Sequence, residues 1–381
     1  MKRVYLDNAA TTPMDPEVVK VMTHYMQNEF GNPSSTHFYG RQNKAAIERS
    51  RRSVAKHLNA APAEIIFTSG GTEADNMAIR CSTRDLGVTH IITSEIEHHA
   101  VGHTAEGETA NGVKLSHVKL LPNGHVDLAH LEDLLTSSSD KKLVSLMHGN
   151  NEIGNLLPLE EVSRMCRKHG AYFHSDTVQT MAHYRFDLQK LDIDFITGAA
   201  HKFHGPKGVG FLYVNKNLKM QALIHGGAQE RGMRGGTENL YGIVGLAKAI
   251  EIAHQGMEEH AQYIRKIKAY FIEKLQVSFP NIIFNGDSAD VANSLYTVLS
   301  VCFPTSSMSS LLLFTLDLKG VSASGGSACS SGSNLGSHVL AALNANPELP
   351  VVRFSFSKNN TLEEVDTVLE ILNEIYKAEK A

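Results

Sequence analysis

The sequence contains few cysteines and no long apolar run. Four cysteines occur among 381 residues, far apart and without a CxxC pair, at Cys81, Cys166, Cys302 and Cys329. This usage argues against a disulfide framework and against a cysteine-ligated zinc site, so it favours a reducing compartment. The first residues, "MKRVYLDNAATTP", lack the apolar centre of a signal peptide, and no later run is long enough to span a bilayer. We therefore expect a cytoplasmic protein that does not enter a membrane.

The chain also lacks an excess of basic residues. Its formal net charge is -4, and its Lys and Arg residues are scattered. Nucleic-acid binding needs a basic surface and membrane recruitment needs a basic cluster, so we expect neither partner. A hydrophobic content of 42% and a charged content of 20% are typical of a soluble globular protein. The length is sufficient for a large core and for two domains.

Short apolar runs alternate with helical stretches between about residues 60 and 215. This alternation predicts an α/β fold with a mostly parallel sheet and helices on both faces. Ligands of such sheets bind beyond the carboxyl ends of the strands, so we searched for polar residues there. The predicted buried strands are "EIIFT" (64–68), "HIITS" (90–94), "KLVSLM" (142–147), "AYFHS" (171–175), "DFIT" (194–197) and "VGFLYV" (209–214).

The pattern changes at residue 257. A long amphipathic helix follows, then "SLYTVLSVCF" (294–303), which alternates enough to predict a half-buried strand, and a last helix that opens at Thr361 with Glu364 as its capping box. These elements predict a smaller α+β domain. We expect a large domain over 16–256 and a small domain formed by 1–15 and 257–381, with a cysteine-bearing loop over 322–337.

A turn of small residues feeds a predicted helix at "TSGGTEADN". Ser69 to Thr72 follow a strand, and the backbone N–H groups of such a helix start can hold a phosphate. The alternative is an ordinary turn in which Thr72 caps the helix. The motif alone does not decide between the two.

Two ionisable residues follow later strands. Asp176 ends an apolar run, where a carboxylate needs a cationic partner, although it could instead cap the next helix. Lys202 follows another strand in a Gly- and Pro-rich turn, and a desolvated lysine is suited to Schiff-base chemistry, although most lysines are solvated surface charges. A phosphate cradle, a carboxylate and such a lysine together indicate pyridoxal 5'-phosphate.

The chain resembles the class V aminotransferase family, specifically the NifS/IscS-type cysteine desulfurases. Ten segments carry the resemblance in order along almost the whole chain. The resemblance implies the PLP-dependent transferase fold type I and a homodimer. The segments are "YLDNAATTP", "FGNPSSTH", "TSGGTEADN", "EIEHHA", "HGNNEIG", "HSDTVQ", "AAHKFHGPKG", "RGGTEN", "SGGSACSSGS" and "VRFSF".

The resemblance also implies a role for each matching residue. Lys202 would hold the cofactor, Asp176 would pair with the ring nitrogen, Gln179 would bond the ring oxygen, and His98 would stack on the ring and move protons. Asn151 would lie near the ring oxygen and the substrate, and Arg353 would bind the substrate carboxylate. Gly71, Thr72 and His201 would hold the phosphate, and Thr237 would reach the phosphate of the neighbouring subunit.

Cys329 resembles the nucleophile of the family, carried on a mobile loop. The implied reaction converts L-cysteine to L-alanine through a PLP aldimine and a persulfide on Cys329. The sulfur would pass to an acceptor such as an iron–sulfur scaffold or a carrier for thio-cofactor or tRNA thiolation. Gly and Ser around the cysteine would give the loop its reach.

Two positions depart from the family pattern. Ala199 stands where relatives usually have Ser, which removes a hydroxyl contact to the phosphate worth about 1 kcal/mol. Gly326 stands where Ser is common. His99 and His103 could share a helix face, but without a third ligand or an HExxH pattern we expect no metal site.

Other functions remain open at this point. A selenocysteine lyase would use the same chemistry and need Cys329 less. A class V transaminase or a kynureninase-like enzyme would need no thiol on a loop. A non-catalytic sulfur-carrier or scaffold subunit could keep the fold, although retention of the lysine, aspartate, histidine and arginine argues against it.

Overall fold

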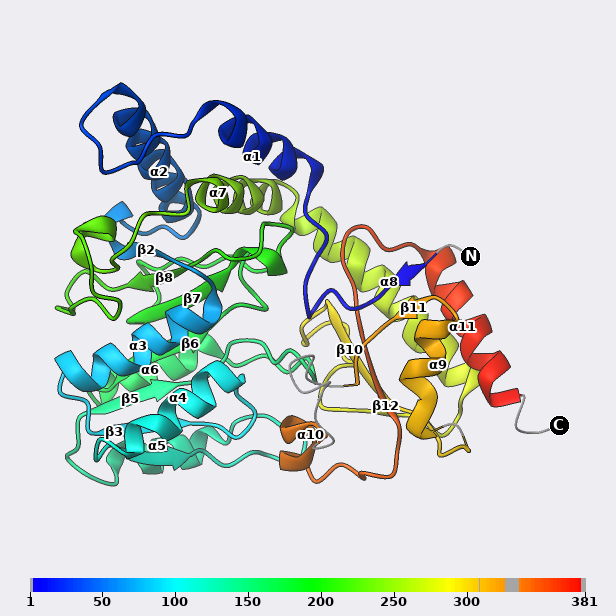
Figure 1. Cartoon of the computed structure of the whole chain (residues 1–381). Helices are drawn as coiled ribbons and strands as arrows, with labels where there is room; N and C mark the ends of the chain where they lie inside the picture. The colour runs from blue at the N-terminus through cyan, green and yellow to red at the C-terminus, as the bar shows by residue number, and fades with distance from the viewer. Residues whose placement is uncertain (1–2, 308, 326–335, 378–381) are drawn as a thin grey trace.

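The computed structural model describes residues 3–307, 309–325 and 336–377 (Figure 1). Its largest feature is a seven-stranded sheet in which β7, β6, β5, β3 and β4 run parallel, whereas β8 is antiparallel to β2 and β7. The predicted mostly parallel sheet is therefore confirmed. In spatial order the strands are β2 (Ile65–Thr68), β8 (Gly210–Val214), β7 (Phe195–Ala199), β6 (Tyr172–Asp176), β5 (Lys142–Ser145), β3 (His90–Thr93) and β4 (Lys114–His117).

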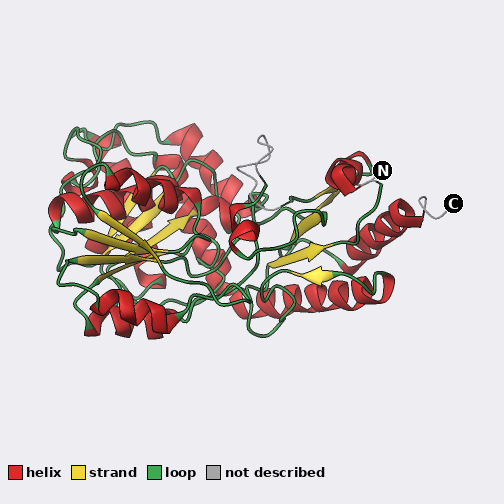
Figure 2. Ribbon diagram, turned by 90° about the horizontal axis from the view of Figure 1, so that it is seen from below, coloured by secondary structure: helices red, strands yellow, loops and turns green. Residues whose placement is uncertain are grey.

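Helices cover both faces of this sheet (Figure 2). Side chains alternate along each strand, so Ile66 packs on one face while Ile65 and Phe67 pack on the other. The Ile66 face carries α3 (Gly71–Asp85) and α4 (His99–Thr109). The opposite face carries α1 (Pro16–Asn28), α2 (Phe38–His57), α5 (Leu128–Thr136), α6 (Leu159–Lys168) and α7 (Leu240–Gln255).

The six strands predicted in this region all form, but β4 was missed. Its sequence, "KLSH", has no apolar run, and none of its four residues is fully buried. An edge strand needs only one neighbour, here β3, and can keep polar side chains in solvent. A search for buried apolar runs therefore passes over it.

A second apolar cluster joins the two ends of the chain. Val4 and Leu6 pack there with residues of the elements that follow residue 257. Strands β12, β10 and β9 form an antiparallel sheet, and β1 (Val4–Tyr5) pairs in parallel with β11. The domain boundaries stay a prediction. The elements are α8 (Met257–Ser278), β9 (Ile283–Phe284), β10 (Val298–Cys302), α9 (Leu312–Leu318), β11 (Val321–Ser322), α10 (His338–Ala342), β12 (Val351–Ser355) and α11 (Leu362–Lys377).

The strand predicted within 294–303 forms as β10, but the prediction that it is half-buried was wrong. All five residues of β10 are buried. Leu299 and Val301 face the apolar cluster, while Ser300 and Cys302 contact Asn285: the Asn285 Nδ2 donates to Ser300 Oγ at 3.0 Å, and Cys302 Sγ donates to Asn285 Oδ1 at 3.2 Å. The polar face is thus bonded to protein rather than to water.

The carboxyl edge of the large sheet gathers the starts of two helices and the ends of two strands. Strand β6 ends at Asp176 and β7 at Ala199, while α3 begins at Gly71 and α4 at His99. Residues from both ends of the chain reach the same edge. Within the described ranges, no helix combines the length and apolar character needed to cross a bilayer.

A buried ion pair ties α2 to the segment before α7. Arg51 and Glu230 are 2% and 6% exposed, and both guanidinium Nη atoms bond the carboxylate, at 2.6 and 2.8 Å. Glu230 also accepts the backbone N–H of Phe67 in β2. The pair therefore fixes β2 and the following turn, from which α3 begins.

Replacing Arg51 with Met should lower the free energy of unfolding by about 3–5 kcal/mol, because the Glu230 carboxylate would be left buried without its cation. Chemical denaturation would measure the loss. As a control, Arg164→Met removes an ion pair with Glu160 in which both side chains are mostly exposed, and it should change stability by less than about 1 kcal/mol. Equal losses in the two variants would contradict the assigned role of the buried pair.

Candidate active site

One cavity at the carboxyl edge of the large sheet gathers most of the predicted site residues. It lies where β6 and β7 end and where α3 and α4 begin. The parallel strands explain this convergence, because their carboxyl ends meet at one edge. Nine predicted residues line the cavity: Gly71, Thr72, His98, Asn151, Asp176, Gln179, His201, Lys202 and Arg353.

Lys202 lies in a short 3-10 turn directly after β7. Its Nζ donates to the carbonyls of Ala9 and Ala10, at 2.6 and 3.0 Å. Gln179 Nε2 donates to the same Ala9 carbonyl at 3.0 Å. The Ala9 N–H in turn donates to Ser355 Oγ at 2.8 Å. The N-terminal segment thus forms a wall of the site and is held by residues from the other end of the chain.

Asp176 is the last residue of β6 and is 7% exposed. Its Oδ1 accepts the Val178 N–H at 2.8 Å. Burial raises the pKa of the Asp176 carboxyl, the nearby Asp75 raises it further, and His98 opposes the shift. One donor atom each from Asp75, His98 and Asp176 lies within 4.8 Å of the others. The carboxylate therefore faces a site that would favour a positively charged group.

His98 caps the N-terminus of α4. Its Nδ1 accepts the Ala100 N–H at 3.1 Å, so Nδ1 carries no proton in this arrangement. Burial lowers the pKa of the His98 imidazole, so its neutral form prevails. The preceding Glu97 is buried and accepts the Met147 N–H with both carboxylate oxygens, at 3.0 and 2.9 Å. The bond from Ala100 orients the His98 imidazole, and the bonds from Met147 hold the neighbouring residue Glu97 in place.

The start of α3 has no side-chain cap. Gly70 is the N-cap residue and Thr72 makes no capping bond there, so the ordinary-turn alternative with Thr72 as the cap is not what forms. A Cβ at Gly71 would lie 2.8 Å from Val178 Cγ2, so only glycine lets the helix start approach this closely. Ala199 is fully buried at the same wall. A helix start of this kind is suited to an anion.

Arg353 projects from β12 into the cavity and is 1% exposed. Its Nη2 donates to Asp7 Oδ1 at 2.9 Å and its Nη1 to the Asn151 carbonyl at 3.0 Å. Its buried Nε finds no hydrogen-bond partner among the described residues. The guanidinium is thus positioned by protein contacts, with donor capacity left for a carboxylate.

Both end regions of the cysteine-bearing loop (322–337) contact residues at or next to this cavity. Near the start of the loop, the Arg353 N–H donates to the Ser324 carbonyl at 2.6 Å. Near its end, Ser337 Oγ donates to the Glu152 carboxylate, and just after the loop His338 Nε2 donates to the Glu97 carbonyl at 2.8 Å. Cys329 and Gly326 lie outside the described residues, so the role predicted for Cys329 stays a prediction.

Thr237 does not join this cavity. It is exposed and lines a separate pocket with Ser69 and Arg234. Nothing within the described part of this chain brings it to the predicted phosphate site. The role predicted for it, in a neighbouring subunit, is untested.

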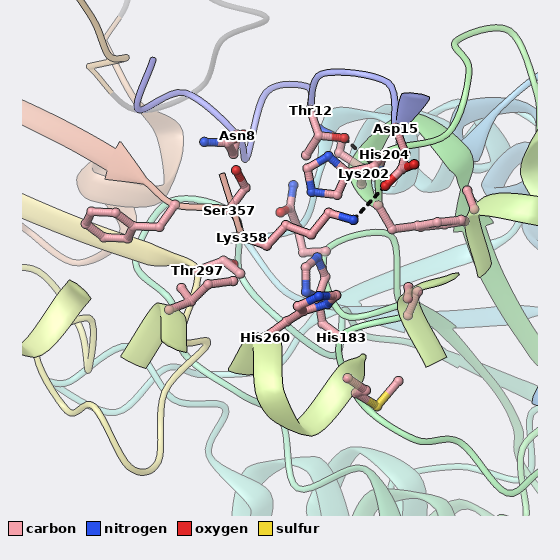
Figure 3. A pocket seen from close by; sticks show the side chains of 18 of the residues that line it. Asn8, Thr12, Asp15, His183, Lys202, His204, His260, Thr297, Ser357 and Lys358 are labelled. Carbon is pink, nitrogen blue, oxygen red and sulfur yellow. Dashed lines mark hydrogen bonds and ion pairs between the residues drawn. The ribbon is translucent and has the colours of Figure 1, made fainter. Parts of the chain in front are cut away.

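A second cavity is also lined by Lys202 (Figure 3). Lys202 and Gln179 line both cavities. Lys358 Nζ forms an ion pair with Asp15 at 2.7 Å here, and burial lowers the pKa of the neighbouring His183 to about 4. In this cavity Lys358 and Asp15 thus neutralise each other, and His183 is uncharged.

Sequence reasoning missed two carboxylates of the site. Asp75 lines the cavity from α3, and Glu97 accepts the backbone N–H of Met147, which also lines the cavity. Both stand inside quoted motifs, as the Asp of "TEADN" and the second Glu of "EIEHHA". Both stretches also contain other polar and charged residues, so the sequence does not distinguish these two carboxylates from solvated ones; burial does, and the sequence does not show burial.

The fold is that of the PLP-dependent transferases of fold type I. The structure titled "NIFS-LIKE PROTEIN" superposes with a TM-score of 0.90 at 37% sequence identity, over 99% of this chain and 100% of that one. The structure titled "SspA in complex with cysteine" gives a TM-score of 0.80 at 30% identity, over 94% and 99% of the two chains.

The sequence comparisons agree with this class. The profile of the family described as Aminotransferase class-V matches residues 4–368. Cysteine desulfurase IscS of Dictyoglomus turgidum is 42% identical over 380 residues, which is 98% of this chain and 95% of the relative. The chain belongs to the class-V aminotransferase family.

The buried Glu97 should give stability a measurable pH dependence. Burial raises the pKa of this carboxyl from 4.5 to about 8. A carboxyl that is harder to ionise in the folded chain destabilises the fold as pH rises between its unfolded and folded pKa values. Relative to Glu97→Gln, the wild-type chain should lose up to about 1.4 kcal/mol per pH unit across that window, measured by denaturation.

The exposed neighbour Glu95 supplies the control, because Glu95→Gln should leave this slope unchanged. A Glu97→Gln variant whose stability changes with pH in parallel with the wild type would show that Glu97 does not carry the buried proton.

Proposed function

We propose that this chain is a PLP-dependent cysteine desulfurase that converts L-cysteine to L-alanine and delivers the sulfur. The observation that carries the proposal is the convergence of Lys202, Asp176, His98 and Arg353 on one cavity. The relatives named as cysteine desulfurases, and the similar structure whose title states a complex with cysteine, support the choice of substrate.

The cavity fits pyridoxal 5'-phosphate. Asp176 is buried and faces a place for a cation, and the uncapped start of α3 at Gly71 and Thr72 suits a phosphate. His98 would lie against the ring, Gln179 and Asn151 would bond its oxygen, and His201 would contact the phosphate. Bound there, the cofactor would supply an aldehyde carbon for amines and a ring that withdraws electrons from the substrate.

The protein side chains would bind the substrate and move its protons. Arg353 would bind the substrate carboxylate, because Asp7 and the Asn151 carbonyl already hold its guanidinium in place. The Lys202 amine would exchange its contacts with Ala9 and Ala10 for the cofactor, and later take and return protons. His98 would share that work through Nε2, since its Nδ1 is occupied by the helix start.

Cys329 would carry out the sulfur step. Its thiol takes the substrate sulfur: the substrate carbon–sulfur bond breaks, a sulfur–sulfur bond forms on Cys329, and the substrate carbon ends with the hydrogen that makes alanine. Cysteine and one enzyme thiol thus give alanine and one enzyme persulfide, with no outside oxidant. The anchoring of Ser324 and Ser337 at the cavity supports delivery of Cys329 to it.

We also propose a homodimer, a cytoplasmic location and a protein acceptor such as an iron–sulfur scaffold. Thr237 supports the dimer, because it is exposed and does not line the cavity of its own chain. The sequence composition supports the location. The acceptor follows from the chemistry, because a persulfide must be discharged before the next turnover.

Lys202→Ala should abolish the visible absorption band of the purified protein, because the amine that bonds the cofactor is lost. Absorbance spectra with added pyridoxal 5'-phosphate measure this. Lys207→Ala, an exposed lysine in the same turn, is the matched control and should keep the band. A band that persists in Lys202→Ala would assign the bond to another lysine.

Cys329→Ser should lower alanine formation from L-cysteine by at least about a hundredfold, because a serine hydroxyl does not form a persulfide, while cofactor absorption stays intact. Alanine release and the persulfide mass on the protein are the readouts. Cys81→Ser is the control, since Cys81 is buried and its pKa is raised to about 11. Unchanged alanine release from Cys329→Ser would remove Cys329 from the reaction.

A further inference from the structure

Asp75 is a buried carboxylate inside the active-site cavity to which the proposed function gives no task. It projects from the first turns of α3 and is 1% exposed. Its Oδ1 has no hydrogen-bond partner among the described residues, and the nearest cationic candidate, His174 Nε2, lies 3.4 Å away. Leaving a carboxylate oxygen buried and unbonded is costly, so its retention calls for a function.

Strand geometry places Asp75 beside Asp176. His174 and Asp176 are two residues apart on β6 and therefore face the same side of the sheet, the side covered by α3. One carboxylate oxygen of Asp75, one of Asp176 and one nitrogen of His98 lie within 4.8 Å of one another. Two buried carboxylates at this separation cannot both ionise cheaply.

The neighbourhood offers little to neutralise a second negative charge. Burial lowers the pKa of His174 to about 4, so that imidazole is neutral, and its ring nitrogens contact Ser145 Oγ and Thr197 Oγ1 at 2.8 and 3.1 Å. Burial raises the pKa of the Asp75 carboxyl against a hydrogen bond from Thr197, and burial followed by the charge of Asp75 raises the pKa of Asp176. The titratable groups around the pair are Glu97, His98, His174, His201, Lys202 and Arg353.

We propose that Asp75 is a second carboxylate of the ring-nitrogen site, which shares a proton with Asp176 in the cofactor-free chain and releases it when the positively charged ring nitrogen binds. This inference rests on the proposed function. Asp75 acts through Asp176 and is a positioning residue: it makes the site more negative only when a cation is present. The proton leaves to solvent, and the ring nitrogen keeps its own.

Proton release on binding makes affinity depend on pH with a fixed sign. Because binding expels a proton, affinity rises as pH rises through the range where the pair would otherwise hold it. With Asp75 replaced by Asn, burial still raises the pKa of Asp176, but the like charge of Asp75 that raises it further is gone, so fewer protons are released on binding. The difference between the two proteins isolates the pair, because all other titrating groups are common to both.

The test measures the binding of pyridoxine 5'-phosphate to the full-length chain from which the cofactor has been removed. This probe has the ring and the phosphate but no aldehyde to bond Lys202. Between about pH 5.5 and pH 7 the wild-type affinity should rise by up to about tenfold per pH unit more than that of Asp75→Asn. Calorimetry in buffers of different ionisation enthalpy should show release of up to about one proton by the wild type and less by the variant.

Asp85→Asn is the matched control. It lies at the end of the same helix, pairs with Arg84 and does not line the cavity, so it should behave as the wild type. If Asp75→Asn does not fold, the wild-type measurement still decides, because absence of proton release between about pH 5.5 and pH 7 would overturn the proposal. Equal pH dependence in wild type and Asp75→Asn would overturn it as well.

Failure of pyridoxine 5'-phosphate and pyridoxal 5'-phosphate to bind at any pH would instead refute the proposed function. The two failures are therefore distinguishable.

Discussion

The architecture of the site depends on the burial of negative charge at the tip of one strand. Asp176 ends β6 inside the protein, beside Asp75, and burial lowers the pKa of the two neighbouring imidazoles, those of His98 and His174. Apolar side chains on both faces of the sheet deprive these carboxylates of water. This place in the folded chain therefore favours an added positive charge, which a cationic ligand would supply.

Three other groups of the cavity are held by contacts with the surrounding chain. His98 is fixed by the helix it caps, Lys202 by the carbonyls of the N-terminal segment, and Arg353 by Asp7 and a carbonyl. Such contacts set directions before a substrate arrives, which lowers the entropy cost of reaching a reactive arrangement. They also leave the buried Arg353 Nε without a hydrogen-bond partner among the described residues, and this donor faces what the cavity can bind.

The sequence predicted the parts of the fold that depend on apolar periodicity. Six buried strands formed where expected, and the capping box at Thr361 formed with bonds of 3.2 and 3.3 Å to Glu364. Strand β4 escaped because an edge strand needs no apolar run, and β10 was called half-buried because its polar residues were assumed to meet water. The motifs in the sequence pointed to nine residues that the fold brings to one cavity. They did not point to Asp75, because its burial arises only when α3 packs against β6.

The N-terminal wall has a consequence for how the molecule is made. Ala9 is held by Ser355, which is synthesised 346 residues later. Until β12 has emerged, the segment whose carbonyls receive the Lys202 amine lacks this contact. The lysine pocket is thus completed only after β12 has been synthesised, although the lysine itself is made much earlier.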